Sequence, residues 1–376
     1  MDRRTFLQAT AAAPVALAAS LHEDLPKYQI VSRYQPAAQP GMPGAYPGKV
    51  ARVHAGKAID EPSEKVDAPT VREMISQGMR ALTGDADARD SWARFFNSAD
   101  VVGIKVNCSG APGIMSTPEV VGEIVRNLGV VGLKPNQIWI YERFQNQVAS
   151  VHYDSFVPAG VHIWTAEHDR GSIAGYDPNT YVDVNFFGEE DTRSNMARVV
   201  TEHFTKIINV PNMKDHGAAG VTGCLKNIAY GSFSNVARSH SGFKTNTYSF
   251  IGTLASVEPL RSRTVLAIMD GLRGVWHGGP FSPSRKFRFY PKQMLFGTDP
   301  VSIDRLLLDV IDDKRKAEHA TSVWDRSMAH IKSGRGYDNN PSVDRFVREP
   351  GHIEYASTLG LGVYEIDRIQ VRKIEL

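Results

Sequence analysis

The chain has 376 residues, of which 42% are hydrophobic and 22% charged, a composition typical of a globular protein with a substantial core. Its 43 basic residues nearly balance its 41 acidic residues and are scattered along the sequence. The sequence therefore lacks the concentrated basic patch that would indicate binding to nucleic acid or to an anionic membrane surface.

The first residues have the pattern of a twin-arginine export signal. Arg3 and Arg4 precede Phe6 and a weakly hydrophobic, alanine-rich run, and Ala16-Leu17-Ala18 offers a peptidase site. An amphipathic helix of the fold would need a polar face, which this stretch lacks. We therefore predict a signal peptide over residues 1–20 and a periplasmic or secreted protein, exported folded by the twin-arginine translocation machinery. This route suits a protein that receives a cofactor inside the cell, but the sequence leaves that cofactor unknown.

The mature chain is expected to begin with an irregular arm. Residues 21–68 are rich in Pro, Gly and Ala and predict one edge strand near Val50. Residues 69–376 are expected to form a single α/β domain with no membrane span, because no later apolar run approaches the ~20 residues that a bilayer requires. Within it, residues 69–84 predict a helix that begins near a proline and ends at Gly84.

Strands and helices alternate from residue 100 onwards. An apolar strand over 100–107, a helix over 117–128 with Thr117 as its N-cap, and a strand over 137–142 form a β-α-β unit. Further predicted elements continue this order, with apolar strands at 206–211, 265–270 and 294–297 and a helix at 299–311. This order predicts an α/β fold with a mostly parallel sheet covered by helices on both faces.

Polar and ionisable residues follow the predicted strands at the points where the strands end. Ligands collect at the carboxyl ends of parallel strands, so these residues are expected to surround one cleft. They are Lys105, Asn107 and Cys108, then Glu142 and Arg143, then the run 211–216, and finally Asp270, Thr298 and Asp299. Glu142 is a candidate general base, with a salt bridge as the alternative interpretation.

The segment 211–227 carries the densest set of candidate residues. Its glycines allow a ligand to approach the backbone, while Lys214 and Lys226 offer positive charge for a phosphate or carboxylate. Asp215, His216 and Cys224 could instead hold a metal ion, although their spacing matches no diagnostic metal motif. The alternative is structural, with the glycines in turns, Asp215 capping a helix and His216 satisfying a buried carbonyl.

These residues resemble those of the family called domain of unknown function 362. The resemblance covers about residues 98–312 and rests on several short motifs in one order. Its motifs are Lys105 and Asn107, then Pro211, Lys214 and His216, then Thr222, Lys226 and Asn227, then Asp270 with Gly279-Pro280, and finally Asp299-Pro300-Val301 with Asp304. Many relatives carry a ferredoxin-like module with cysteine-rich cluster motifs, and this chain has no such run. The resemblance therefore does not imply an iron–sulfur cluster.

The two cysteines, Cys108 and Cys224, both fall in segments assigned to the cleft. They could form a disulfide, remain as separate buried thiols, or share a metal ion with His216. The sequence leaves these alternatives open, and it leaves the presence of a metal ion open as well.

The first functional hypothesis is an exported enzyme that binds a small anionic or polyhydroxylated substrate. Its catalytic candidates are His216, Asp215, Lys226 and Asp270, and its ligand-binding candidates are Lys105, Asn107, Lys214, Thr222, Asn227 and His240. No nucleophile elbow, Walker loop or dinucleotide-binding fingerprint is present, which disfavours the corresponding enzyme classes. The alternative is a non-enzymatic periplasmic module that binds a solute or a redox partner, and a purely structural protein ranks third.

Overall fold

The computed structural model describes residues 25–167, 174–282, 284–332 and 339–376. The predicted signal peptide, residues 1–20, lies outside the described residues. The strands are β1 (Gln29–Val31), β2 (Lys49–His54), β3 (Val102–Val106), β4 (Ile138–Phe144), β5 (His162–Glu167), β6 (Tyr176–Asp183), β7 (Arg193–Ala197), β8 (Lys206–Val210), β9 (Asn212–His216), β10 (Gly220–Thr222), β11 (Thr264–Val275), β12 (Arg288–Phe289), β13 (Gln293–Gly297) and β14 (Gln370–Glu375). The α-helices are α2 (Ala68–Thr83), α3 (Ala88–Ala93), α4 (Pro118–Val130), α5 (Gln145–Ala149), α6 (Arg198–Glu202), α7 (Cys224–Ser232), α8 (Thr247–Ala255), α9 (Leu260–Arg263), α10 (Pro300–Ala317) and α11 (His352–Thr358).

The main sheet has the strand order β14-β2-β13-β11-β8-β3-β4-β5, with β9 and β12 paired to β11 and β10 paired to β9. Pairing is parallel from β11 through β8, β3 and β4 to β5. The predicted α/β fold with a mostly parallel sheet is therefore confirmed. Strand β13, however, runs antiparallel to both β11 and β2, so the sheet is mixed at that end.

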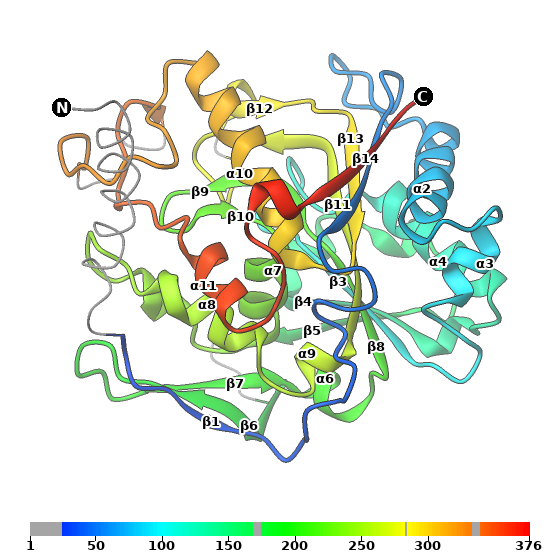
Figure 1. Ribbon diagram of the computed structural model, residues 1–376, viewed down its shortest axis with the longest axis horizontal. Helices are drawn as coiled ribbons and strands as arrows, with labels where there is room; N and C mark the ends of the chain where they lie inside the picture. The colour runs from blue at the N-terminus through cyan, green and yellow to red at the C-terminus, as the bar shows by residue number, and fades with distance from the viewer. Residues whose placement is uncertain (1–24, 168–173, 283, 333–338) are drawn as a thin grey trace, which may run out of the picture.

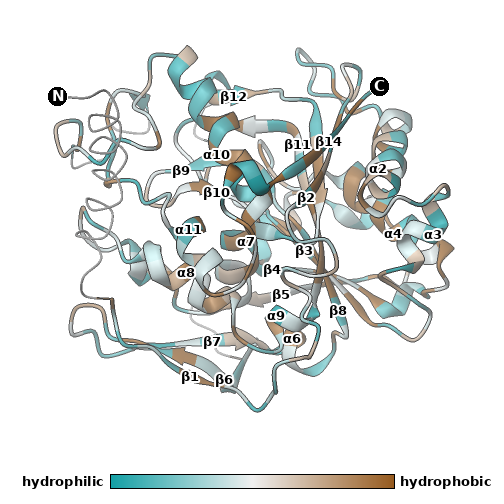
Figure 2. Ribbon diagram, viewed as in Figure 1, coloured by the Kyte–Doolittle hydropathy of each residue, from teal (hydrophilic) through white to brown (hydrophobic). Residues whose placement is uncertain are grey.

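Helices cover both faces of this sheet (Figure 1). Helices α2, α3 and α4 lie on one side, and α7, α8, α10 and α11 lie on the other. Strand β11 supplies both cores because its side chains alternate: Leu266 and Ile268 face one core, while Ala267 and Met269 face the other. Figure 2 shows hydrophobic colour on the central strands and on the side of α2 that faces the sheet.

The elements with a strong local pattern lie where the sequence predicts them. Helix α2 begins after Asp67, whose carboxylate accepts the Thr70 amide, and it stops at Gly84, which has a φ of 84°. That left-handed conformation is one that glycine adopts without strain. The β3-α4-β4 unit is also present. No helix of the described part is long and apolar enough to cross a membrane.

Two predictions about the irregular segments are wrong. The arm supplies β2, which is not an edge strand, since it pairs with β13 on one side and β14 on the other. The arm also supplies β1, which joins β6 and β7 in a separate three-stranded sheet. The glycine-rich segment after β8 is not a loop but the hairpin β9–β10. The partners of β2 are remote in the sequence, and the turn between β9 and β10 is short. Local hydrophobic periodicity therefore predicts neither feature.

Candidate functional site

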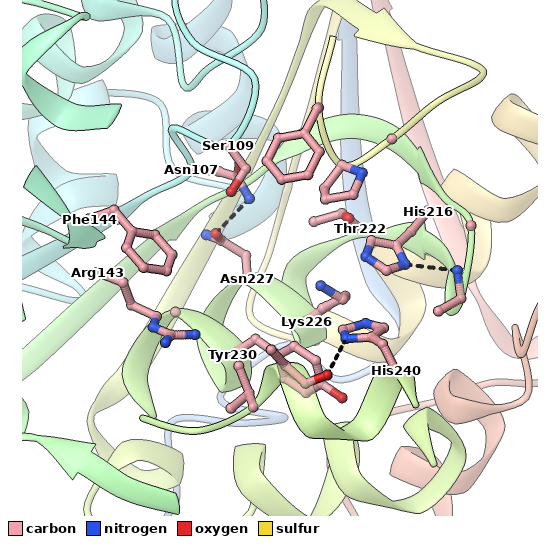
Figure 3. A pocket seen from close by; sticks show the side chains of 18 of the residues that line it. Asn107, Ser109, Arg143, Phe144, His216, Thr222, Lys226, Asn227, Tyr230 and His240 are labelled. Atoms are coloured by element: carbon pink, nitrogen blue, oxygen red, sulfur yellow. Dashed lines mark hydrogen bonds between the residues drawn. The ribbon is translucent and has the colours of Figure 1, made fainter. Parts of the chain in front are cut away.

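A cavity of about 520 Å³ lies at the carboxyl ends of β3 and β4, beside the β9–β10 hairpin and the first turns of α7. The loops 236–241, 278–281 and 345–346 complete its wall. Figure 3 shows Lys226, His216 and His240 gathered on one side, Arg143 with Phe144 on the other, and Asn107 with Asn227 between them. A cavity is therefore present at the strand ends, and its loops include the predicted His240 and the Gly279-Pro280 motif, whereas the 345–346 segment was not predicted.

Lys105 and Glu142 form a buried ion pair at the floor of this cavity. They come from the neighbouring parallel strands β3 and β4, and Lys105 Nζ lies 2.9 Å from Glu142 Oε2. The lysine also donates to the Val106 carbonyl oxygen and, at 3.4 Å, to Asn227 Oδ1. Glu142 additionally accepts the Cys108 amide at 3.3 Å. Each charge is therefore compensated by the other. The contacts of Glu142 match the salt-bridge interpretation, which the sequence offered as the alternative to a general base.

The Lys105 side chain reaches this position only because residue 231 on α7 is glycine. A Cβ at Gly231 would lie 1.9 Å from Lys105 Cε and 2.4 Å from its Nζ. Both distances are far below van der Waals contact, so any side chain there would have to displace the ion pair. The glycine therefore lets α7 pack directly on a charged side chain.

Lys214 is fully buried and does not line the cavity. Its Nζ donates to Asn107 Oδ1 at 2.6 Å, to the Ser109 carbonyl oxygen at 2.5 Å and to the Pro280 carbonyl oxygen at 3.4 Å. These three acceptors match the three donors of an ammonium group. Burial lowers the pKa of Lys214 to about 7. The lysine predicted to hold a ligand thus ties together two loops behind the cavity wall.

Asn107 and Asn227 form an amide pair that does line the cavity. Asn107 Nδ2 donates to Asn227 Oδ1 at 3.0 Å, and Asn227 Nδ2 donates to Asn209 Oδ1 at 2.8 Å. The orientation of each amide is therefore set by its neighbours. Thr222 also lines the cavity, and its Oγ1 is buried with no hydrogen-bond partner in the described part of the chain.

Lys226 lies in the first turn of α7 and differs from the other two lysines. It lines the cavity and is 8% exposed, yet it has no hydrogen bond or ion pair with any described residue. Its Nζ instead lies 4.5 Å from the centroid of the Tyr230 ring, one helical turn further on. Burial, reinforced by the charge of Lys214, lowers the pKa of Lys226 to about 7.

The hydrogen bonds of His216 determine its tautomer. The amides of Ala218 and Ala219 both donate to His216 Nδ1, each at 3.1 Å. Nδ1 therefore carries no proton, and the proton of the neutral ring sits on Nε2. Burial holds the pKa of His216 well below its ordinary value, and the nearby charge of Lys226 lowers it further. His216 thus presents a neutral N–H donor, and it has no lone pair left for a metal ion.

His240 has the opposite tautomer. Its Nδ1 lies 3.3 Å from the Ala237 carbonyl oxygen, to which it donates. Its Nε2 is then an acceptor, and it is buried without a partner among the described residues. Burial lowers the pKa of His240 to about 3, with Lys226 contributing. The two rings lie 5.1 Å apart, so the cavity combines one imidazole donor and one imidazole acceptor.

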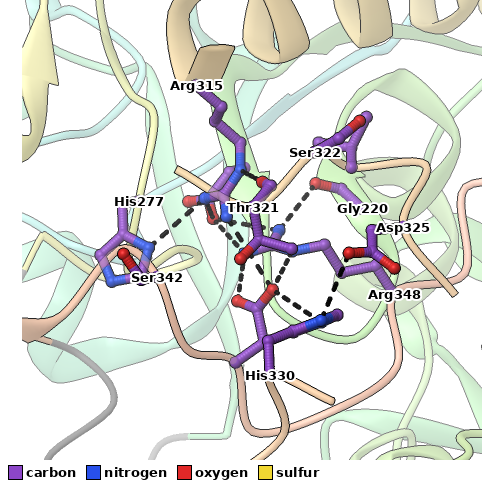
Figure 4. Close-up of polar contacts among 12 residues, drawn as sticks. Gly220, His277, Arg315, Thr321, Ser322, Asp325, His330, Ser342 and Arg348 are labelled. Carbon is purple, nitrogen blue, oxygen red and sulfur yellow. Dashed lines mark hydrogen bonds and ion pairs between the residues drawn. The ribbon is translucent and has the colours of Figure 1, made fainter. Parts of the chain in front are cut away.

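Asp215 lies outside the cavity, although it precedes His216 in the chain. Side chains alternate along β9, so Lys214 and His216 share one face and Asp215 takes the other. Asp215 Oδ1 accepts the Gly279 amide at 2.7 Å, and its Oδ2 accepts both terminal nitrogens of Arg348 at 3.2 Å. Arg315 lies 3.5 Å from the same oxygen. Figure 4 shows Arg315 and Arg348 within this group of polar contacts. The Asp215 carboxylate therefore anchors a buried ion network rather than orienting His216.

Asp270 is also separate from the cavity. Its Oδ2 accepts the Thr117 amide at 2.7 Å, at the start of α4, and its Oδ1 accepts the Leu272 amide at 3.1 Å. Burial raises the pKa of this carboxyl group. Neither carboxylate that the sequence offered as a proton-transfer partner for His216 contacts that histidine.

The predicted metal set of Asp215, His216 and Cys224 is not assembled. No group of three or more His, Cys, Asp or Glu residues suited to a metal ion occurs within the described ranges. Cys108 and Cys224 do not form a disulfide, and they belong to the cores on opposite faces of the sheet. Of the three alternatives for the cysteines, the structure favours separate buried thiols.

Several residues of the cavity were not among the candidates. Tyr230 is four residues after Lys226 on the same helix, a spacing that could have identified it. Arg345 and Phe346 come from a loop more than a hundred residues downstream, for which the sequence carries no signal. The Asp215–Arg348 contact holds that loop against the hairpin.

Comparison with known proteins gives one family. The profile of the family described as Domain of unknown function (DUF362) matches residues 102–309, which include most of the cavity but not Arg345 or Phe346. No curated protein matches the chain.

Proposed function

This chain belongs to DUF362, a family described as a domain of unknown function, and we propose from the residues of its cavity that the protein is an enzyme acting on a small anionic substrate there. The single observation that carries this proposal is Lys226, a buried lysine that faces the cavity and forms no ion pair with any described residue. A polar group buried in this way lowers the stability of the fold, and a ligand can compensate that cost.

The charges of the cavity favour an anion. Lys105, Arg143, Lys226 and Arg345 line it, whereas Glu142 is the single acidic residue among the described residues of the lining and is paired with Lys105. The aromatic rings of Phe144, Phe281 and Phe346 form other parts of the wall. A small molecule with one anionic group and an apolar body would complement both features. The amides of Asn107 and Asn227 would suit hydroxyl groups on such a molecule.

Proton-transfer groups favour an enzyme over a binding module. An anion-binding protein needs positive charge and N–H donors, but it gains nothing from an unpartnered imidazole acceptor such as His240 Nε2. We assign His216 Nε2 as a donor to a substrate oxygen, His240 Nε2 as a hydrogen-bond acceptor for a substrate N–H or O–H group, and Lys226 as the central cation or the amine that exchanges a proton. Asp215 and Asp270 have no direct part in this scheme.

The test begins with ligand-dependent thermal stability of the purified protein. Inorganic phosphate, pyruvate, lactate and neutral glycerol are compared, together with the variants Lys226→Met and Lys373→Met. Lys373 is an exposed residue of β14 and serves as the matched control. An anion present at one hundred times its Kd should stabilise the fold by about 2.7 kcal/mol. Lys226→Met should fold and lose this stabilisation, while Lys373→Met should keep it.

Two outcomes contradict the proposal. One is a Lys226→Met variant that does not fold, since that would make the lysine structural. The other is an anion response that is the same in both variants. Any stabilising anion is then incubated with the protein and followed by NMR. Conversion supports an enzyme, whereas an unchanged ligand whose affinity survives His216→Gln supports the solute-binding alternative.

We further propose that the protein is exported folded to the periplasm or the medium by the twin-arginine machinery. The paired Arg3 and Arg4 and the alanine-rich run behind them carry this proposal.

A further inference from the structure

The three lysines in the cavity wall and behind it differ in what their nitrogens contact. Lys105 is paired with the Glu142 carboxylate, and Lys214 donates to three oxygens. Lys226 has neither a carboxylate nor an oxygen acceptor within bonding distance among the described residues, and its Nζ lies over the face of the Tyr230 ring, 4.5 Å from the centroid. Only Lys226 can therefore lose its proton without breaking a hydrogen bond or an ion pair.

We propose that Lys226 is a nucleophile that forms an imine with the carbonyl group of a small anionic substrate of the 2-oxo acid class. The inference rests on the proposed function, since it takes the cavity as an anion site and names the substrate class and the bond formed there. Lys105 and Lys214 are excluded from this role by the contacts above.

The environment of Lys226 favours the neutral amine that such a reaction needs. With its pKa lowered to about 7, Lys226 has a substantial fraction of neutral amine at pH 7. An exposed lysine with a pKa of 10.5 is neutral in roughly one molecule in three thousand at that pH. The charged and titratable groups around Lys226 are Lys214, Arg143, Glu142, Tyr230, His216, His240 and His352. The cations among them oppose protonation of the amine, and Glu142 is already paired with Lys105.

The reaction balances without any further reactant. The lone pair of the neutral amine attacks the carbonyl carbon, and the carbonyl π electrons move to oxygen, which takes up a proton to give a carbinolamine. Loss of water from this adduct leaves a carbon–nitrogen double bond, so one amine and one carbonyl yield one imine and one water. His216 Nε2–H can donate to the oxygen as negative charge develops on it, and His240 Nε2 can accept a hydrogen bond from the nitrogen, whose proton passes to the oxygen.

Reductive trapping tests this inference on the full chain. The protein is incubated at pH 7 with pyruvate and cyanoborohydride, which delivers hydride to the imine carbon and fixes the substrate to the lysine as a secondary amine. Peptide mass mapping then compares Lys226 with the exposed Lys373 in the same sample. We expect at least tenfold more label on Lys226 at pH 7, since far more of its amine is neutral. The ratio should fall as the pH approaches 10, where Lys373 also becomes neutral.

The wild-type peptide map makes the result independent of whether any variant folds. Lys226→Met should lose the dominant label, and Lys373→Met should keep it. Glyoxylate and 2-oxoglutarate are tested in the same way, because the cavity could exclude pyruvate by size. Equal labelling of the two lysines with all three probes overturns the inference.

Lactate separates failure of this inference from failure of the proposed function, because it has the charge of pyruvate but no carbonyl group. If lactate or phosphate stabilises the protein through Lys226 and no probe labels that residue, the imine is refuted and the anion site stands. If no anion binds and no probe labels Lys226, both proposals fail.

Discussion

Replacing Gly231 by alanine tests whether the close packing of α7 on Lys105 stabilises the fold. The new Cβ would lie 1.9 Å from Lys105 Cε, so the lysine or the helix must move. Lys105 is fully buried and paired with Glu142, and a shift of its side chain weakens that pair. The substitution therefore combines overpacking with damage to a buried ion pair.

The expected loss follows from three contributions. Overpacking costs about 1–3 kcal/mol, and separating a buried charge from its partner costs up to about 3–5 kcal/mol. Alanine in place of glycine inside a helix returns about 1 kcal/mol. Since Lys105 keeps its bond to the Val106 carbonyl oxygen under a small shift, we expect a net loss of about 2–4 kcal/mol.

The assay is the free energy of unfolding from urea titration, with Gly129→Ala as the matched control. Gly129 lies in α4, and a Cβ there would meet no atom within 4 Å. That variant should be as stable as the wild type or more stable by up to about 1 kcal/mol. If Gly231→Ala is also as stable as the wild type, Lys105 is not confined by α7 and the reasoning is refuted.

Three further predictions concern pH, the buried ion network and export. The folded pKa of Lys226 is about 7 and the unfolded value is near 10.5, so the unfolded state binds more protons between these values and stability rises with pH across that window. Lys226→Met should therefore be more stable than the wild type at pH 7, and this advantage should shrink towards pH 10. Free energies of unfolding from urea titration that change with pH by the same amount in both proteins would contradict this. Asp215→Asn should cost about 3–5 kcal/mol by leaving buried guanidinium groups uncompensated, whereas Glu365→Gln at an exposed pair should cost under about 1 kcal/mol, as urea titration can measure. Replacing Arg3 and Arg4 together by lysine should retain the precursor in the cytoplasm, and cell fractionation that finds it exported would exclude the twin-arginine route.

The sequence predicted the elements whose pattern is local. Strand β3, helix α4 and strand β4 form where an apolar run, a Thr-Pro helix start and a second apolar run occur in order. Helix α2 ends at Gly84 for a reason that is visible in the sequence. The position of β2 between β13 and β14 is not predictable in this way, because its partners lie more than two hundred residues away.

The candidate residues divide along the same line. Seven of the candidates line the cavity: Lys105, Asn107, Thr222, Lys226, Asn227, His216 and His240. Lys105 and Asn107 can be found from the sequence because they stand at the end of an apolar strand. Asp215 and Asp270 were proposed for the same reason, yet backbone amides and Arg348 occupy their oxygens. Position at a strand end indicates which edge of the sheet a residue occupies but not the direction in which its side chain points.

By itself, the sequence determined the α/β class, the edge of the sheet at which polar residues meet, and the supply of lysines and histidines there, because each depends on neighbours within one or two turns or strands. The tertiary structure alone decided which of these lysines has no hydrogen bond or ion pair within the described part of the chain. Lys105, Lys214 and Lys226 are the same residue type, and each follows or lies near a strand end. Their chemistry differs because Glu142 pairs with the first, three oxygens surround the second, and the third lies over the Tyr230 ring with no hydrogen bond to a described residue. Such differences arise from contacts between distant segments, and these exist only in the folded chain.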